Sequence, residues 1–196
     1  MVDGLLIPAT TAGAESRRML AVAAHQDAVR TLMQQCRSAR VALRAVDIAE
    51  TALRNLSVLA GGDRAHAFLH VGRRSSRLLL VWQREICTFR QFEYDSESIA
   101  ATPPHERGAL LERIALDVQR TADAFVRQFH AAHLDTLWLC ADARSLEALA
   151  ELGQMLALKV QPYVASQYLE LPPGAELFDA AEGVDYTLVV GAALRQ

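Results

Sequence analysis

The stretch from His66 to Tyr94 most constrains the fold of this chain. It contains three apolar runs, rich in β-branched and aromatic residues, that are separated by short polar or glycine-containing breaks. Such runs, divided by tight turns, are typical of an antiparallel β-meander. In the third run, Thr88, Arg90 and the alternation that begins at Gln91 predict a strand with one face toward water. We therefore expect three paired strands at the centre of the fold.

Helices and strands alternate after the meander. A long helix is predicted from Glu106 to His133, because its apolar residues recur at spacings of three and four. The other predicted elements are two strands (Thr136 to Cys140, Lys159 to Tyr163), a helix capped by Ser145 and ending near Leu156, a loop (Leu171 to Gly174) and a helix from Glu182 or Asp185 to Leu194. The order β-β-β-α-β-α-β-α predicts an α/β fold in which two parallel strands extend the meander into a mixed sheet. This is the order of a ribonuclease-H-like half-domain.

A smaller α/β unit is expected before the meander. It comprises two strands, a helix and a third strand: Asp3 to Ala9, Arg18 to Ala24, His25 to Arg40, and Leu43 to Ile48. Asp47 is predicted to cap the next helix in a capping-box variant with Glu50, and Gly61 and Gly62 end that helix. We therefore expect a β-β-α-β subdomain over residues 1–46, a connecting helix over 47–62 and the larger domain over 63–196.

Composition excludes several classes of protein. The chain has 196 residues, of which 52% are hydrophobic, so a sizeable core is available. The net charge of −3 argues against a nucleic-acid arm or a membrane-surface patch. No apolar run is long enough to span a bilayer, and the first residues do not resemble a signal peptide. The cysteines, Cys36, Cys87 and Cys140, are too widely spaced for a disulfide framework or a metal site and fit a reducing cytosol.

One segment carries a family resemblance. The sequence Ala45-Val-Asp-Ile-Ala-Glu-Thr-Ala-Leu-Arg-Asn-Leu56 resembles the PilM branch of actin-like ATPases, and most of all its MshI-like members from MSHA-type pilus biogenesis. The similarity continues through the meander and a Leu-Pro-Pro-Gly loop to the Gly-Ala-Ala-Leu-Arg ending. It implies an actin-like ATPase (ribonuclease H-like) half-domain, without the N-terminal part that carries the first phosphate loop in this family.

The resemblance places a phosphate loop at the first turn of the meander. Actin-like proteins use Asp-x-Gly-x-x-x-Thr there, so that backbone N–H groups reach the phosphate and the aspartate organises Mg²⁺. The matching residues are His70, Gly72 and Ser76, and a neutral imidazole is a poor magnesium ligand. Arg73 and Arg74 could still attract phosphate. Alternatively, both are solvated arginines on a hairpin tip.

The adenosine turn of the family maps to Ala141, Asp142 and Ala143. The family has a Gly-Gly turn at this position, but no glycine occurs here, and Asp142 puts a charge where the nucleotide would lie. The two alanines are small enough to leave room for the base. Alternatively, this is an ordinary strand-to-helix loop. No catalytic residues and no metal site are assigned, and ATP with Mg²⁺ remains the alternative to a protein without a cofactor.

The predicted function is therefore an assembly platform with degenerate nucleotide binding, a pseudo-ATPase rather than an active enzyme. By resemblance, such a protein is cytoplasmic and binds the tail of a PilN-like bitopic inner-membrane protein in a type IV pilus or type II secretion-like machine. The expected contact surface is Asp3 to Ile48, whose strand edges suit an extended peptide. A homodimer through an open sheet edge is a further possibility, whereas nucleic acid and direct membrane insertion are not expected. The rival prediction is an ATP-binding protein with weak ATPase activity.

Overall fold

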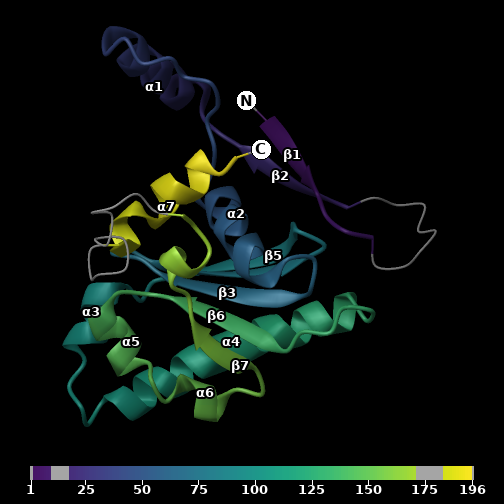
Figure 1. The fold of residues 1–196 in the computed structure, drawn as a ribbon, viewed down its shortest axis with the longest axis vertical. Coiled ribbons are helices and arrows are strands. Elements are labelled where there is room, and N and C mark those ends of the chain that lie inside the picture. Colours follow the sequence, from purple (N-terminus) through teal and green to yellow (C-terminus); the bar gives the residue numbers. More distant parts are fainter. Residues whose placement is uncertain (1, 10–17, 171–182, 196) are drawn as a thin grey trace.

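A computed structural model describes residues 2–9, 18–170 and 183–195. Its centre is a five-stranded mixed sheet with the strand order β5-β4-β3-β6-β7 (Figure 1). The strands are β3 (His66–Val71), β4 (Ser76–Trp82), β5 (Glu85–Phe92), β6 (Thr136–Cys140) and β7 (Lys159–Pro162). β3, β4 and β5 are antiparallel, while β6 and β7 run parallel to β3. The predicted meander and its parallel extension are confirmed.

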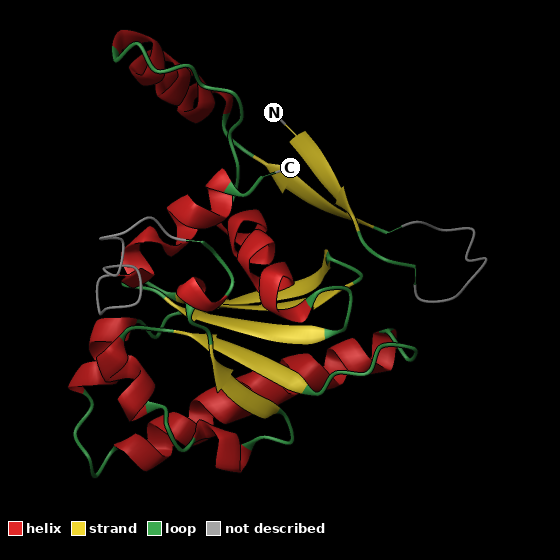
Figure 2. Ribbon diagram, in the orientation of Figure 1, coloured by secondary structure: helices red, strands yellow, loops and turns green. Residues whose placement is uncertain are grey.

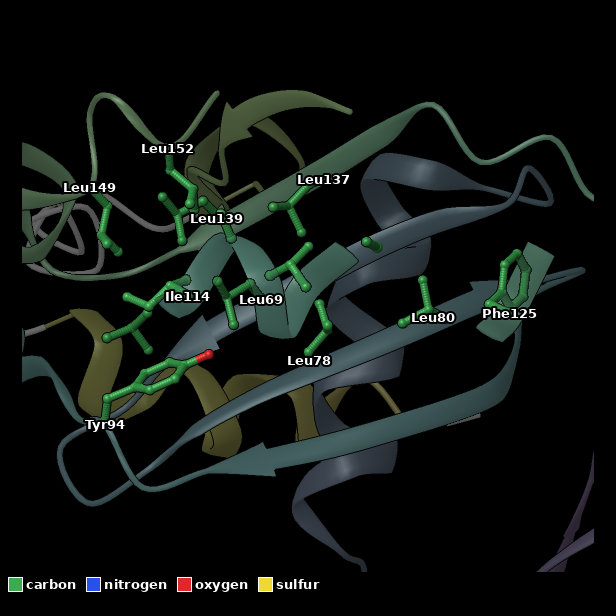
Figure 3. Packing of buried hydrophobic residues seen from close by; sticks show 14 of the residues in the cluster. Leu69, Leu78, Leu80, Tyr94, Ile114, Phe125, Leu137, Leu139, Leu149 and Leu152 are labelled. Atoms are coloured by element: carbon green, nitrogen blue, oxygen red, sulfur yellow. The ribbon is translucent and has the colours of Figure 1, made fainter. Parts of the chain in front are cut away.

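Helices cover both faces of this sheet (Figure 2). One face carries α2 (Ala49–Gly61) and α7 (Gly183–Ala193), and the other carries α3 (Ser96–Ala101), α4 (Arg107–Gln128), α5 (Ala143–Ala148) and α6 (Leu152–Met155). Successive strand residues point to opposite faces, so Leu69 packs toward Ile114 of α4 whereas Phe68 packs toward Leu53 of α2. Figure 3 shows the α4 side of this core. A short 3₁₀ turn, η1 (Ala165–Gln167), follows β7.

The turns of the meander follow from local chemistry. Gln83 and Arg84 join β4 to β5, and both have positive φ values, of 53° and 65°. A two-residue hairpin loop with a type I′ turn requires positive φ at both of its residues. The backbone N–H of Gln83 also donates to the carbonyl oxygen of Asp63 at 3.0 Å, which ties this hairpin to the segment after α2.

The first unit contains fewer strands than expected. β1 (Val2–Leu6) and β2 (Met19–Ala23) form a separate antiparallel ribbon, and α1 (Gln26–Ser38) follows. The predicted strand from Leu43 to Ile48 is wrong, because these residues form no ladder with the ribbon. Their apolar side chains are largely exposed, at 39% for Leu43 and 44% for Val46. An apolar run therefore indicated a strand where no strand of the described residues pairs with it.

Three further details differ from the sequence prediction. The helix expected from Ser145 to Leu156 divides into α5 and α6, and Asp142 rather than Ser145 is the N-cap. Asp47 is not the N-cap of α2, because Ile48 holds that position and no side chain caps the helix. Glu50 completes no capping box, because its carboxylate binds Arg77. Helix α3 was not predicted. The Leu171–Gly174 loop lies outside the described residues, and no helix within those described is long and apolar enough to cross a membrane.

Candidate functional site

The two predicted nucleotide loops lie at the same edge of the sheet. β3 and β6 are neighbours and parallel, with His70 beside Cys140 in the ladder. The carboxyl ends of both strands therefore meet, and the loops that follow them lie next to each other. The structure thus brings together both predicted groups: Gly72, Arg73, Arg74 and Ser76 after β3, and Ala141, Asp142 and Ala143 after β6.

The β3–β4 turn uses its hydrogen-bonding groups internally. The N–H of Gly72 donates to the carbonyl oxygen of Ser75 at 3.3 Å, and the carbonyl oxygen of Gly72 accepts from the N–H of Ser96 at 2.9 Å. The hydroxyl of Ser76 is buried and donates to the carbonyl oxygen of Tyr94 at 2.8 Å. The N–H of Gly72 and the hydroxyl of Ser76, which the family resemblance assigns to phosphate, are therefore engaged inside the protein.

The imidazole of His70 packs against this turn. Its side chain is buried, and a Cβ atom added to Gly72 would lie 2.9 Å from His70 Cε1 and 3.1 Å from the carbonyl oxygen of Ser75. Glycine is required here because the turn and the ring approach each other so closely. His70, at the position where the phosphate loop of actin-like proteins has an aspartate, thus fills the inner side of the turn.

Three arginines lie in or next to the turn, in two different environments. Arg73 and Arg74 are exposed at its tip. Arg77, one residue after Ser76, points toward α2, where its Nε lies 3.2 Å from Glu50 Oε1. Two guanidinium groups therefore remain at the solvent-facing side of the turn.

The β6–α5 turn has its carboxylate engaged in helix capping. Asp142 Oδ1 accepts from the N–H of Ser145 at 2.8 Å, and Oδ2 accepts from the Ser145 hydroxyl at 3.2 Å. The same hydroxyl lies 3.3 Å from the carbonyl oxygen of Ser96, the residue whose N–H binds Gly72. Asp142 is thus a structural N-cap, and Ser96 and Ser145 connect the two turns. The Asp142-x-x-Ser145 spacing could have revealed this cap in the sequence.

A pocket of about 430 Å³ opens on a different part of the molecule. One wall is the β1–β2 ribbon and another is α2 from Thr51 to Leu59, while Val29 of α1, the β4–β5 hairpin and the two residues after α7 complete it. This volume lies in the range of small-ligand and peptide-side-chain pockets. Much of the segment that carries the family resemblance lines it: Val46, Asp47, Ile48, Thr51, Arg54 and Asn55.

Two ion pairs stand at the pocket wall. Arg195 Nη1 lies 3.2 Å from Asp47 Oδ2, and Arg54 Nη1 lies 3.8 Å from Glu85 Oε1. Asp47 Oδ1 also accepts hydrogen bonds from the Thr51 hydroxyl and the N–H of Ile48. Asp47 therefore joins the start of α2 to the C-terminal residues. The sequence pointed to the ribbon side of this pocket but missed the other walls, which come from distant parts of the chain.

Two buried cysteines and the histidines of the described residues were the other candidates for chemistry. Burial raises the pKa of the Cys87 and Cys140 thiols to about 12, so both are protonated at neutral pH. No group of three or more histidine, cysteine or acidic residues in the described part of the chain could hold a metal ion. His130 and His133 are both exposed near the end of α4.

The fold and these two regions can be compared with known proteins. No family model matches the chain, and no curated protein matches it. A chain of a solved PilM–PilN type IV pilus biogenesis complex matches with a TM-score of 0.72 at 17% identity, over 100% of this chain and 66% of that one. The fold is the PilM-like, actin-like ATPase fold.

A second solved structure supports the same assignment. The ethanolamine utilization protein EutJ from Carboxydothermus hydrogenoformans matches with a TM-score of 0.55 at 12% identity, over 88% of this chain. This chain spans 66% of the PilM–PilN complex chain and 62% of EutJ. At these identities the similarity establishes the fold alone.

Proposed function

We propose that this chain is an assembly-platform protein of a type IV pilus, of the MSHA type, or of a type II secretion-like machine. It binds the cytoplasmic tail of a PilN-like inner-membrane protein, and is itself cytoplasmic and peripheral to the membrane through that partner. A structural match that covers all of this chain and 66% of a chain of a PilM–PilN complex supports a role in pilus assembly.

The observation that carries the proposed tail site is the composition of the pocket. The α2 segment that resembles PilM-like proteins forms one wall, and the β1–β2 ribbon forms the opposite wall. The ribbon has only two strands in the described residues, so each strand retains one unpaired edge. Unpaired strand edges bind extended peptides through main-chain hydrogen bonds, while adjacent pockets accept alternate side chains. An extended tail beside the ribbon would therefore place side chains in this pocket.

The state of the two nucleotide loops supports a role that does not require ATP turnover. Gly72 and Ser76 have their hydrogen-bonding groups engaged within the protein, and Asp142 caps a helix. His70 stands where the family has an acid that organises Mg²⁺. We therefore expect a pseudo-ATPase that acts by protein–protein contact.

A peptide-binding experiment tests the platform function. A labelled peptide with the N-terminal cytoplasmic sequence of a PilN-like protein is titrated with the chain, and its fluorescence anisotropy is measured. Leu59→Arg places a charged side chain at the pocket, and Leu59 is 39% exposed, so the fold should persist. Leu116→Arg on α4 is the matched control, because Leu116 is 47% exposed and does not line the pocket.

We expect the wild type and Leu116→Arg to bind the peptide alike, and Leu59→Arg to bind at least about tenfold more weakly, a loss of about 1.4 kcal/mol. Absence of binding by the folded wild-type protein would overturn the platform function. Equal peptide affinity of all three proteins would show that the pocket is not the binding site for the tail.

A second candidate function is ATP binding with weak hydrolysis. It is favoured by one observation: the two predicted loops lie side by side, with Arg73 and Arg74 exposed next to them. Calorimetric titration with ATP and Mg²⁺ tests it, first with this chain and then with the first half of a PilM-like protein added. Micromolar binding that Arg73→Gln/Arg74→Gln abolishes would establish this candidate and exclude the pseudo-ATPase.

A further inference from the structure

Helix α1 projects from the body of the protein at the outer end of the ribbon (Figure 1). None of the 13 residues of this fully described helix is buried. Its apolar residues nevertheless recur at helical spacing and form one stripe: Val29, Leu32, Met33 and Cys36. Leu32 and Met33 are each 38% exposed. Val29 and Cys36 are half-buried, so the exposed part of the stripe is its centre, Leu32 and Met33. An amphipathic helix with an exposed apolar centre is adapted to a surface that its own chain does not provide.

The charge of this region differs from that of the whole chain. Residues 18–46 contain five arginines, one aspartate and no lysine or glutamate, a net charge of +4. The complete chain carries −3, so the rest carries −7. The single acid, Asp27, is paired with Arg30 at 3.5 Å. The net charge of −3 is therefore the sum of a basic region and an acidic remainder. It does not argue against a membrane-binding surface on the basic region.

The arginines lie beside the apolar stripe. With about 100° of rotation per residue, Arg30 and Arg37 fall on one flank of the stripe, next to Met33. Asp27 and Ser38 fall on the opposite side of the helix. Long arginine side chains at the border of an apolar stripe can extend toward charged groups while the stripe contacts apolar material.

The C-terminal turn of α1 continues this arrangement. The N–H of Val41 donates to the carbonyl oxygen of Cys36 at 2.8 Å, and the N–H of Arg40 donates to that of Arg37 at 3.0 Å. This is the Schellman pattern, and Arg40 has the left-handed φ of 55° that usually selects glycine. Val41, which is 57% exposed, is thereby held next to the end of the stripe.

We propose that α1 docks on the surface of a bilayer that contains anionic phospholipids. Its apolar stripe contacts the boundary between headgroups and acyl chains, and Arg30, Arg37, Arg40 and Arg44 bind the lipid phosphates. The helix lies on the membrane and does not span it, because it is far too short. This mode of binding combines modest apolar burial with electrostatic attraction, and both are present here.

Two observations favour a bilayer over an acidic protein. The apolar stripe is one side of a single short helix, a small area for a stable protein interface, whereas membrane attraction accumulates with each nearby basic residue. In addition, Val29 of α1 lines the pocket assigned to the partner's tail. This second argument rests on the proposed function, since the tail of a bitopic protein continues into the membrane.

Vesicle flotation tests the proposal without the partner. The chain is mixed with phosphatidylcholine vesicles that contain about 30% phosphatidylglycerol, or none, at low and at high salt. The test variant is Arg30→Gln/Arg37→Gln. The matched control is Arg113→Gln/Arg120→Gln, which removes two exposed arginines at the same seven-residue spacing on α4. A third variant, Leu32→Gln/Met33→Gln, removes the centre of the stripe.

We expect binding to anionic vesicles that salt weakens and that the Arg30/Arg37 variant weakens by about 10- to 30-fold. The α4 control should bind like the wild type, and the stripe variant should bind weakly while it keeps its circular dichroism spectrum. The proposal is overturned by absence of flotation, by equal losses in the α4 control, or by a wild-type dimer that Leu32→Gln/Met33→Gln dissociates. Peptide binding is measured separately, so failure here leaves the platform function untouched.

Discussion

The guanidinium of Arg77 lies 3.2 Å from the carboxylate of Glu50, and both side chains are mostly buried, at 21% and 13% exposed. Arg77 is the second residue of β4, the strand that follows the β3–β4 turn, and Glu50 lies in the first turn of α2. The pair therefore connects the turn resembling a phosphate loop with the helix that lines the pocket. Because Glu50 neutralises Arg77, this arginine adds no net positive charge for a nucleotide at the turn.

Glu50→Gln should destabilise the protein, because it leaves the partly buried guanidinium of Arg77 without its charged partner. We expect a loss of about 1–3 kcal/mol in the free energy of unfolding, measured by urea denaturation. Glu93→Gln, at an exposed position, should change it by less than about 0.5 kcal/mol. Equal values for the two variants would show that the ion pair is energetically unimportant.

Gly191→Ala should also destabilise the protein, although alanine is the better helix former. A Cβ atom at Gly191 would lie 2.2 Å from the carbonyl oxygen of Ala52, so α7 could no longer approach α2 this closely. The hydrogen bond of 2.9 Å from the Asn55 side chain to the Gly191 carbonyl oxygen would be lost as well. We expect a loss of about 2 kcal/mol or more in thermal or urea denaturation.

The control for this substitution is Gly108→Ala on α4. A Cβ atom at Gly108 has no heavy atom within 4 Å among the described residues. This variant should therefore be neutral or more stable by up to about 1 kcal/mol, as helix propensity predicts. If both variants were stabilising, the close packing of α7 on α2 would be refuted.

Stability should fall as the solution becomes acidic, in part because of His66. Burial lowers the pKa of this imidazole below its ordinary value of 6.5. Nδ1 lies 2.8 Å from the carbonyl oxygen of Arg64, while Nε2 is buried and has no hydrogen-bond partner in the described part of the chain. Protonation would put an unpaired N–H and a charge in the core.

The direction of this pH dependence follows from the difference in proton uptake between the folded and the unfolded chain. As pH falls through about 6.5, the unfolded chain takes up a proton that folded His66 does not, so the free energy of unfolding decreases. We expect the melting temperature to drop from about pH 7.5 to about pH 5, with a smaller drop for His66→Gln. His130→Gln, at an exposed site, should retain the wild-type drop. An unchanged pH dependence in His66→Gln would contradict this assignment.

The sequence was most informative about the individual strands of the central sheet. The meander and the strand Thr136–Cys140 were predicted because apolar runs and turn residues report local structure. The apolar run from Leu43 to Ile48 led to a wrong strand prediction, because a strand also needs a neighbouring strand to pair with, and the sequence does not show whether one is present. The pocket could not be predicted, because Asp47 and Arg195 meet only after α7 packs on α2. The inner hydrogen bonds of Gly72 and Ser76 depend likewise on Ser96 and Tyr94 from another segment.

Placing at His70 the acid that actin-like proteins have in their phosphate loop should not create ATP turnover. In His70→Asp the new carboxylate would stand in a buried position, while the Ser76 hydroxyl would still donate to Tyr94 and Asp142 would still cap α5. Phosphate release from ATP with Mg²⁺ should therefore stay at the background of the wild type. His70→Asn, which has nearly the same shape without the charge, is the matched control and separates the effect of a buried carboxylate on stability. Turnover that appears in His70→Asp and is absent from His70→Asn would show that one substitution had silenced an otherwise intact phosphate loop, and the pseudo-ATPase assignment would then fail.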